Sequence, residues 1–151
     1  MALFLSTFIN KIDSKGRVSV PASFRAALSG QAASGVVTYR SIKFPALEAA
    51  GVDRYEELAS RLEQLPEFSE ERDALASILA DSQQLPFDSE GRIILPQSLG
   101  EHAGLNSHAA FVGLGRSFQI WEPERFKQHQ EAMRERARER GLTLPPRAMP
   151  P

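Results

Sequence analysis

An internal repeat constrains this 151-residue chain more than any other feature. The stretch IDSKGRVSVP at positions 12–21 recurs as FDSEGRIILP at positions 87–96, an offset of 75 residues (87 − 12), or half of the chain. Asp, Ser, Gly, Arg and Pro occupy the same places in both copies, and the apolar positions match in kind. This pattern predicts one domain, or two small intertwined ones, built from two similar units.

Each copy has the pattern of a strand, a turn, a strand, a short helix, a further strand and a longer helix. The proline that ends each motif opens a short helix, expected over 22–29 and 97–103, and a glycine follows each one. The further strands are expected over 36–44 and over 110–121, the second of them broken by Gly113 and Gly115. The sequence therefore predicts an α+β fold that is mainly β.

Three longer helices are expected, over 52–65, over about 69–80 and from Pro123 to about Arg140. We expect Asp53 to cap the first of them, with Glu56 as its capping-box partner. A buried stripe on the second is expected to consist of Phe68, Leu75 and Leu79.

The repeat divides the chain into four segments. The first unit is expected over 1–67, a connecting helix over 68–82 and the second unit over 83–140. The remaining stretch, 141–151, is rich in proline and is expected to be an extended, mobile tail.

Composition excludes several classes of protein. The chain has no cysteine, which rules out disulfides, thiolate zinc sites and cysteine nucleophiles and suits a reducing cytosol. It contains no apolar run near the roughly 20 residues that span a bilayer, so we expect a cytoplasmic protein without a membrane partner. The apolar start, 1–8, is too short for a signal-peptide core and is predicted to be a strand. The net charge of −1 counts against nucleic-acid binding unless cations gather locally.

The repeated motif itself has the chemistry of a tight turn. Asp13 and the serine after it can accept hydrogen bonds from nearby backbone, and Gly16 allows a positive φ. Arg17 then opens the next strand, so Asp13 and Arg17 are expected to pair across the mouth of a hairpin. One interpretation is that this pair merely pins the turn. In the second copy, Asp88 and Gly91 have the same positioning roles, and Arg92 takes the place of Arg17.

The two copies differ in charge. The first is polar and basic, through Lys11, Lys15, Arg17, Ser19 and, further on, Arg25. The second has Pro86, Glu90 and Ile94 in place of Lys11, Lys15 and Ser19, which leaves Arg92 as its one cation. Cations neutralise phosphates, and an arginine on a two-stranded ribbon can reach a guanine edge in the major groove. We therefore expect Lys15 and Arg17 to contact DNA, with Lys11, Arg25 and Arg92 as further candidate DNA-binding residues, while the second hairpin mainly completes the barrel.

The doubled Asp-x-x-Gly-Arg motif, with proline four residues after each arginine, resembles the MraZ family of transcriptional regulators. Phe24-Arg25, Gly104-Leu105 and the stretch FQIWE at 118–122 support the resemblance, which runs from about 8 to 126. It implies a duplicated AbrB-like, double-split β-barrel with peripheral helices, formed by swapped hairpins. It also implies that Asp13, Arg17, Asp88 and Arg92 are the functional signature, whereas Glu90 departs from a pattern in which both hairpins touch phosphate equally.

The resemblance implies a function as well. Such proteins form ring-like homo-oligomers and bind short direct repeats of double-stranded DNA upstream of the cell-division and cell-wall operon, mainly as repressors. The expected place of action is the nucleoid. Several copies of the first hairpin on one face of a ring would sum weak contacts through effective concentration.

Other functions find less support in the sequence. An antitoxin-like DNA-binding module is the alternative, but it would predict a long toxin-wrapping tail, and only 141–151 follow the second copy. His102, His108 and His129 show no metal-ligand spacing, and no nucleotide loop or nucleophile motif is present. We therefore expect no catalysis, no cofactor, no metal and no small-molecule substrate. Trp121 is expected in the core, and the charged stretch 131–140 is expected to be a solvated helix face.

Overall fold

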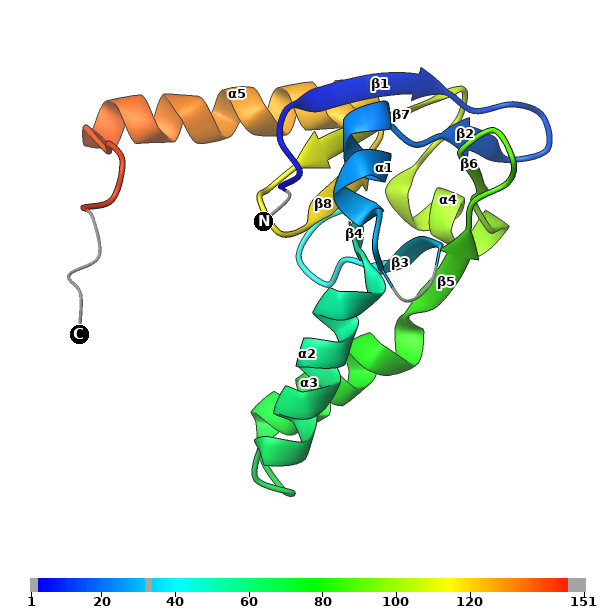
Figure 1. Cartoon of the computed structure of the whole chain (residues 1–151). Coiled ribbons are helices and arrows are strands. Elements are labelled where there is room, and N and C mark those ends of the chain that lie inside the picture. Colours follow the sequence, from blue (N-terminus) through cyan, green and yellow to red (C-terminus); the bar gives the residue numbers. More distant parts are fainter. Residues whose placement is uncertain (1–2, 32–33, 147–151) are drawn as a thin grey trace.

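The computed structural model describes residues 3–31 and 34–146 (Figure 1). Its larger sheet has six antiparallel strands in the order β1 (Thr7–Lys11), β7 (His108–Gly113), β8 (Phe118–Trp121), β4 (Leu47–Ala50), β3 (Gly35–Arg40) and β5 (Gln83–Pro86). The smaller sheet is a two-stranded ribbon of β2 (Arg17–Ser19) and β6 (Arg92–Ile94). The helices are α1 (Ala22–Leu28), α2 (Val52–Gln64), α3 (Glu70–Asp81), α4 (Gln97–Ala103) and α5 (Pro123–Arg140). The predicted α+β class is confirmed.

The two copies of the repeat exchange strands. β1 of the first copy pairs with β7 of the second, and β5 of the second pairs with β3 of the first. In the ribbon, Val18 faces Ile93, its own equivalent at the repeat offset (93 − 18 = 75). The two halves are therefore related by an approximate twofold axis that passes through this pair.

This exchange corrects the expectation of two local hairpins. Within residues 3–31, the only backbone pairing between the β1 segment and β2 is the isolated bridge between Ile12 and Val18. β2 otherwise pairs with β6. A side-chain hydrogen bond from Asn10 Nδ2 to the carbonyl of Ser19, at 2.7 Å, ties the two strands together farther along.

Two further details of the sheet differ from the sequence prediction. The single strand expected over 36–44 is a pair, because β4 (Leu47–Ala50) returns antiparallel to β3. The strand expected over 110–121 is likewise the β7–β8 hairpin, and its turn begins at the expected break, Gly113 to Gly115. Among the described strands, no ladder joins β1 to β5, so the six-stranded sheet is open and does not close into a barrel by hydrogen bonding.

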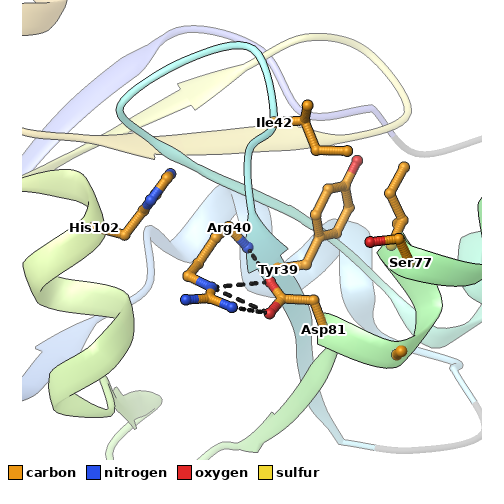
Figure 2. Close-up of a pocket in the computed structure, with 8 residues that line it drawn as sticks. Tyr39, Arg40, Ile42, Ser77, Asp81 and His102 are labelled. Atoms are coloured by element: carbon orange, nitrogen blue, oxygen red, sulfur yellow. Dashed lines mark hydrogen bonds and ion pairs between the residues drawn. The ribbon is translucent and has the colours of Figure 1, made fainter. Parts of the chain in front are cut away.

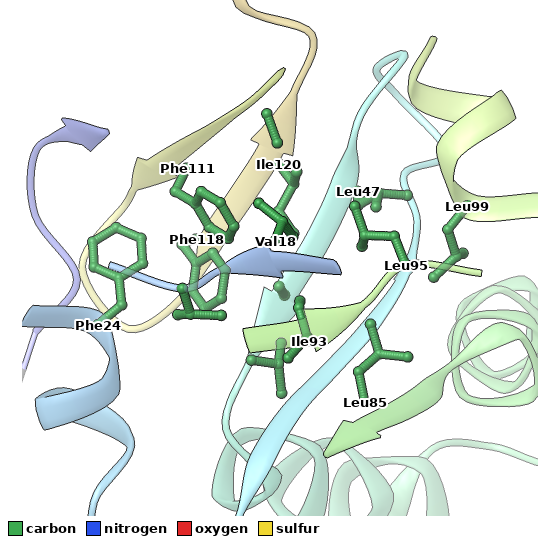
Figure 3. Close-up of a cluster of buried hydrophobic side chains, with 14 of the residues drawn as sticks. Val18, Phe24, Leu47, Leu85, Ile93, Leu95, Leu99, Phe111, Phe118 and Ile120 are labelled. Atoms are coloured by element: carbon green, nitrogen blue, oxygen red, sulfur yellow. The ribbon is translucent and has the colours of Figure 1, made fainter. Parts of the chain in front are cut away.

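The core lies between the ribbon and the large sheet (Figure 3). Alternation along the ribbon turns Val18, Val20, Ile93 and Leu95 inward, where they meet the aromatic and aliphatic side chains of the sheet. Phe24 of α1 is fully buried in this cluster. Trp121 lies in a neighbouring cluster and is 2% exposed, which confirms its predicted place in the core.

Helices α2 and α3 form a helical hairpin, called the acidic arm below and defined as residues 52–81, which projects from the body (Figure 1). The residue that caps α2 is Gly51, so the expected cap by Asp53 is wrong. The backbone N–H of Asp53 instead donates to Oε1 of Gln31 at 3.0 Å. Phe68 is 95% exposed at the turn between the helices, not buried as expected, whereas Leu75 and Leu79 are partly buried.

The ends of α3, α4 and α5 follow the sequence signals. Ser69 caps α3 by accepting the backbone N–H of Arg72 at 3.1 Å. Gly104 and Gly141 end α4 and α5 in the left-handed conformation, each with φ of 65°. The N-terminal segment is less regular than the predicted strand: Phe4 bridges to Gly115, and the regular strand begins at Thr7.

Candidate nucleic-acid interface

The turn of the first motif is organised by the carboxylate of Asp13. Its Oδ1 accepts the backbone N–H groups of Lys15 and Arg17, both at 2.9 Å. Its Oδ2 accepts the side-chain Nε–H of Arg17 at 2.6 Å, so the predicted pair across the turn is confirmed. Gly16 has φ of 81° and donates its N–H to the carbonyl of Asp13 at 3.0 Å. The glycine is required because side chains rarely tolerate that backbone conformation.

The turn of the second motif repeats this geometry. Asp88 Oδ1 accepts the backbone N–H groups of Glu90 and Arg92, both at 2.9 Å, and its Oδ2 accepts the Nε–H of Arg92 at 2.8 Å. Gly91 has φ of 75°. Each arginine is thus held by its aspartate through Nε, and neither outer nitrogen of the guanidinium donates a hydrogen bond to that aspartate.

The surroundings of both aspartates favour the ionised form of the carboxylate. The backbone N–H of Arg17 is the largest cause that lowers the pKa of Asp13 below its ordinary value, and its guanidinium adds to the effect. The pKa of Asp88 is lowered in the same way by Arg92. An ionised carboxylate that already accepts three hydrogen bonds is fitted to position the arginine.

The guanidinium groups differ in what surrounds them. Arg92 Nη2 forms an ion pair with Glu90 Oε2 at 2.8 Å. Lys15 stands at the position equivalent to Glu90, and in residues 3–31 and 34–146 no carboxylate pairs with the Nη atoms of Arg17. The first hairpin, residues 11–19, has three cations and one carboxylate, a net +2, whereas the second, residues 86–94, has one cation and two carboxylates, a net −1.

The two turns lie together on one side of the body (Figure 1). The backbone N–H of Leu95 donates to the carbonyl of Gly16 at 2.9 Å, and that of Val20 donates to Gly91 at 3.2 Å. The charge of Asp13 contributes to raising the pKa of Arg92, after the larger effect of Asp88. On the outer face of the ribbon, Arg17 is opposite Ile94, which is 59% exposed.

The structure separates Arg25 from the other predicted cations of the first copy. Lys11 is exposed at the end of β1, and Lys15 is exposed in the turn. Arg25, on α1, instead covers the second turn: a Cβ built on Gly91 would lie 2.8 Å from its Cζ. This contact joins the two copies, whereas the reason for a glycine at position 91 is its positive φ. No pattern in the sequence indicates the contact of Arg25 with the second turn or the hydrogen bond from Asn10 that ties β1 to β2.

The acidic charge of the chain is concentrated away from the two turns. The acidic arm holds nine carboxylates and three arginines, a net −6. Since the whole chain carries −1, the rest carries +5 (−1 + 6). Figure 1 shows the arm projecting away from the side where the turns lie. The overall charge therefore does not argue against an anionic ligand at the turns.

A hollow of about 510 Å³ lies between β3, α3 and α4 (Figure 2). Its charged wall is an internal ion pair, in which Arg40 Nη2 donates to Asp81 Oδ1 at 2.5 Å. His102 also lines it, and the Nε2 of this histidine is 3.3 Å from the carbonyl of Phe44. The hollow has no unpaired charge of the kind found at the first turn.

The histidines pack separately from one another. His129 stacks on Trp121 with ring centroids 4.7 Å apart, and burial is the main cause that lowers its pKa. The Nδ1 of His108 lies 2.9 Å from the hydroxyl oxygen of Ser107, within hydrogen-bond distance. Within the described ranges no three His, Asp or Glu side chains are grouped as metal ligands. None of the helices in these ranges is long and apolar enough to cross a membrane.

Fold and site together define a class: duplicated chains that exchange strands between their copies and present two Asp–Arg turns on one side. Comparison with known proteins gives the family. The model described as "MraZ protein, putative antitoxin-like" matches residues 3–76 and again 78–143. Proteins named transcriptional regulator MraZ are 46% identical over 145 residues in Rickettsia canadensis (strain McKiel) and 47% identical over 146 residues in Rickettsia bellii (strain OSU 85-389). Each alignment covers 95% of this chain and 97% of the relative. The chain belongs to the MraZ family.

Proposed function

We propose that this chain is a transcriptional regulator that binds double-stranded DNA in a sequence-specific way through its first hairpin. The observation that supports this most is the difference between two otherwise equal turns. Asp13 and Asp88 hold their arginines alike, yet only Arg92 is neutralised by a neighbouring glutamate. The relatives' printed names support the regulatory role.

The proposed contacts divide by chemistry. Arg17 is placed on a two-stranded ribbon, which can enter the major groove and direct a guanidinium to a guanine edge. Lys15 beside it would bind phosphate, and Lys11, Arg25 and Arg92 would add weaker phosphate contacts. Asp13, Gly16, Asp88 and Gly91 position these groups and stay off the anionic backbone.

The finer parts of the proposal concern assembly and target. We propose a ring-like homo-oligomer that presents several first hairpins on one face. Such a ring would bind short direct repeats in the promoter region of a cell-division and cell-wall gene cluster, mainly as a repressor in the cytoplasm at the nucleoid. Contacts that are weak singly become strong when the repeat spacing matches the spacing of the hairpins.

The test is binding to the DNA immediately upstream of the chain's own gene, with the spacing between its repeats varied. We expect affinity to fall by roughly tenfold or more when half a helical turn is inserted between repeats, because the hairpins can no longer all engage. Fluorescence anisotropy at a fixed salt concentration measures this. Equal affinity for all spacings and for unrelated DNA would contradict specific, multivalent binding.

A further inference from the structure

Helix α5 runs past the body of the molecule. Its first turns are anchored, because Phe126 is buried and His129 stacks on Trp121. Beyond His129 the helix projects outward (Figure 1), and residues 130–136 are all exposed. The face of α5 that packs on the body at Phe126 therefore extends into solvent, where no other part of the described chain covers it.

The two faces of this outer half differ. Met133 and Ala137 continue the row of the anchoring Phe126, and Arg136 and Arg140 lie beside them at helical spacing. Of the glutamates, Glu131 and Glu135 lie on the opposite face, whereas Glu139 lies beside Arg136 at three-residue spacing. Met133 is 41% exposed, and neither Arg136 nor Arg140 pairs with a carboxylate among the described residues. The outer half of α5 thus presents an apolar strip flanked by free arginines.

The acidic arm presents the complementary chemistry. The apolar side of α2 packs on α3, which turns its acidic side outward. Glu56 and Glu63 lie seven residues apart on that outer side, are both exposed, and have no cationic partner within the described ranges. At the end of the arm, Phe68 is 95% exposed. Acidic and apolar groups are thus available together on a surface of net charge −6.

We propose that the outer half of α5 docks on the acidic arm of a second copy of this chain. Within one copy, the outer half of α5 and the acidic arm point in different directions and do not meet (Figure 1). The contact is heterologous, head to tail, and contacts of this kind generate closed rings when the rotation between subunits allows it. The inference rests on the oligomer in the proposed function and names its interface. It is independent of which hairpin binds DNA.

Charge exchange tests the contact. Variant A carries Arg136→Glu and Arg140→Glu, and variant B carries Glu56→Lys and Glu63→Lys. We expect each alone to assemble more weakly than the original chain by roughly tenfold or more, because like charges then face each other at the interface. An equal mixture of A and B is expected to regain assembly, since every contact between an A and a B subunit again joins opposite charges. Sedimentation velocity measures the assembly.

The control is Glu131→Arg with Glu135→Arg, a double reversal on the opposite face of α5, which is expected to leave assembly unchanged. Rescue by mixing excludes misfolding of A or B. The proposal is overturned if A or B assembles like the original chain, if the mixture does not recover, or if the original chain is a monomer. It is also overturned if A stays assembled and loses DNA affinity, because the arginines would then serve the nucleic acid. A monomer that still binds DNA through Arg17 would leave the proposed hairpin contact standing.

Discussion

Replacement of Arg17 by alanine is expected to weaken specific DNA binding by roughly 10- to 100-fold, the range that corresponds to one bidentate arginine contact with a base. The structure gives the reason: Asp13 holds Nε of this side chain at 2.6 Å and leaves its outer nitrogens without a carboxylate partner. The matched substitution, Arg92→Ala, removes a guanidinium that Glu90 already neutralises. Its expected loss is about threefold or less.

The two variants are best compared as titrations of one promoter fragment at several salt concentrations. Arg17→Ala should mainly reduce the preference for promoter DNA over unrelated DNA, because its contact is proposed to be with a base, and it should change the dependence of affinity on salt concentration less than loss of a phosphate contact would. Far-UV circular dichroism and thermal unfolding verify that both variants fold. Equal losses for Arg17→Ala and Arg92→Ala would show that the hairpins contribute alike, against the proposed asymmetry.

Replacement of Phe24 by alanine is expected to lower the free energy of unfolding by about 3–5 kcal/mol, the usual cost of removing a buried phenylalanine. Phe24 is fully buried, and its ring lies 5.2 Å from that of Phe4, 5.7 Å from that of Phe8 and 4.9 Å from that of Phe118. The cavity would open where α1 meets both β1 and the β7–β8 hairpin of the second copy, so none of these elements can close it alone.

The chain offers a control with the same chemical change. Phe68→Ala removes a ring that is 95% exposed, and we expect its effect to stay within about 0.5 kcal/mol. Urea unfolding followed by tryptophan fluorescence reports both values, because the single tryptophan, Trp121, lies in the core. A cost below about 1 kcal/mol for Phe24→Ala would contradict the described packing.

The repeat made much of the architecture predictable. Identical turn chemistry at an offset of 75 predicts equivalent halves, and the aspartate–glycine–arginine spacing predicts the turn and its ion pair. The proline before and the glycine after a short stretch located α4 to the residue, at Gln97–Ala103. These signals are local, so the neighbouring sequence is enough to reveal them.

Pairing between distant strands was not predictable in this way. A strand such as β2 has the same alternation whether it pairs with β1 or with β6, since either partner buries Val18. β4 was missed because its sequence, Leu-Glu-Ala-Ala, has no strand preference of its own and depends on β3 and β8 on either side. The contact of Arg25 with the second turn follows from the same exchange.

Overall charge was a poor guide to the candidate site. The sum of −1 conceals an arm of −6 and a remainder of +5, and only the fold shows that the arm and the two turns lie apart. Local composition of the hairpins was more informative, because substitution of Lys15 by Glu90 between the copies already distinguishes them.

The most direct measurement uses the absence of cysteine from the chain. Ser14 and Ser89 are equivalent, exposed positions in the two turns, so Ser14→Cys and Ser89→Cys place a single thiol at matched sites. Each variant is incubated with promoter DNA that carries a disulfide-activated tether on a base within the repeat. The account predicts rapid cross-linking from position 14 and little from position 89. Equal cross-linking from both positions, or cross-linking from position 89 alone, would contradict the claim that the first hairpin faces DNA.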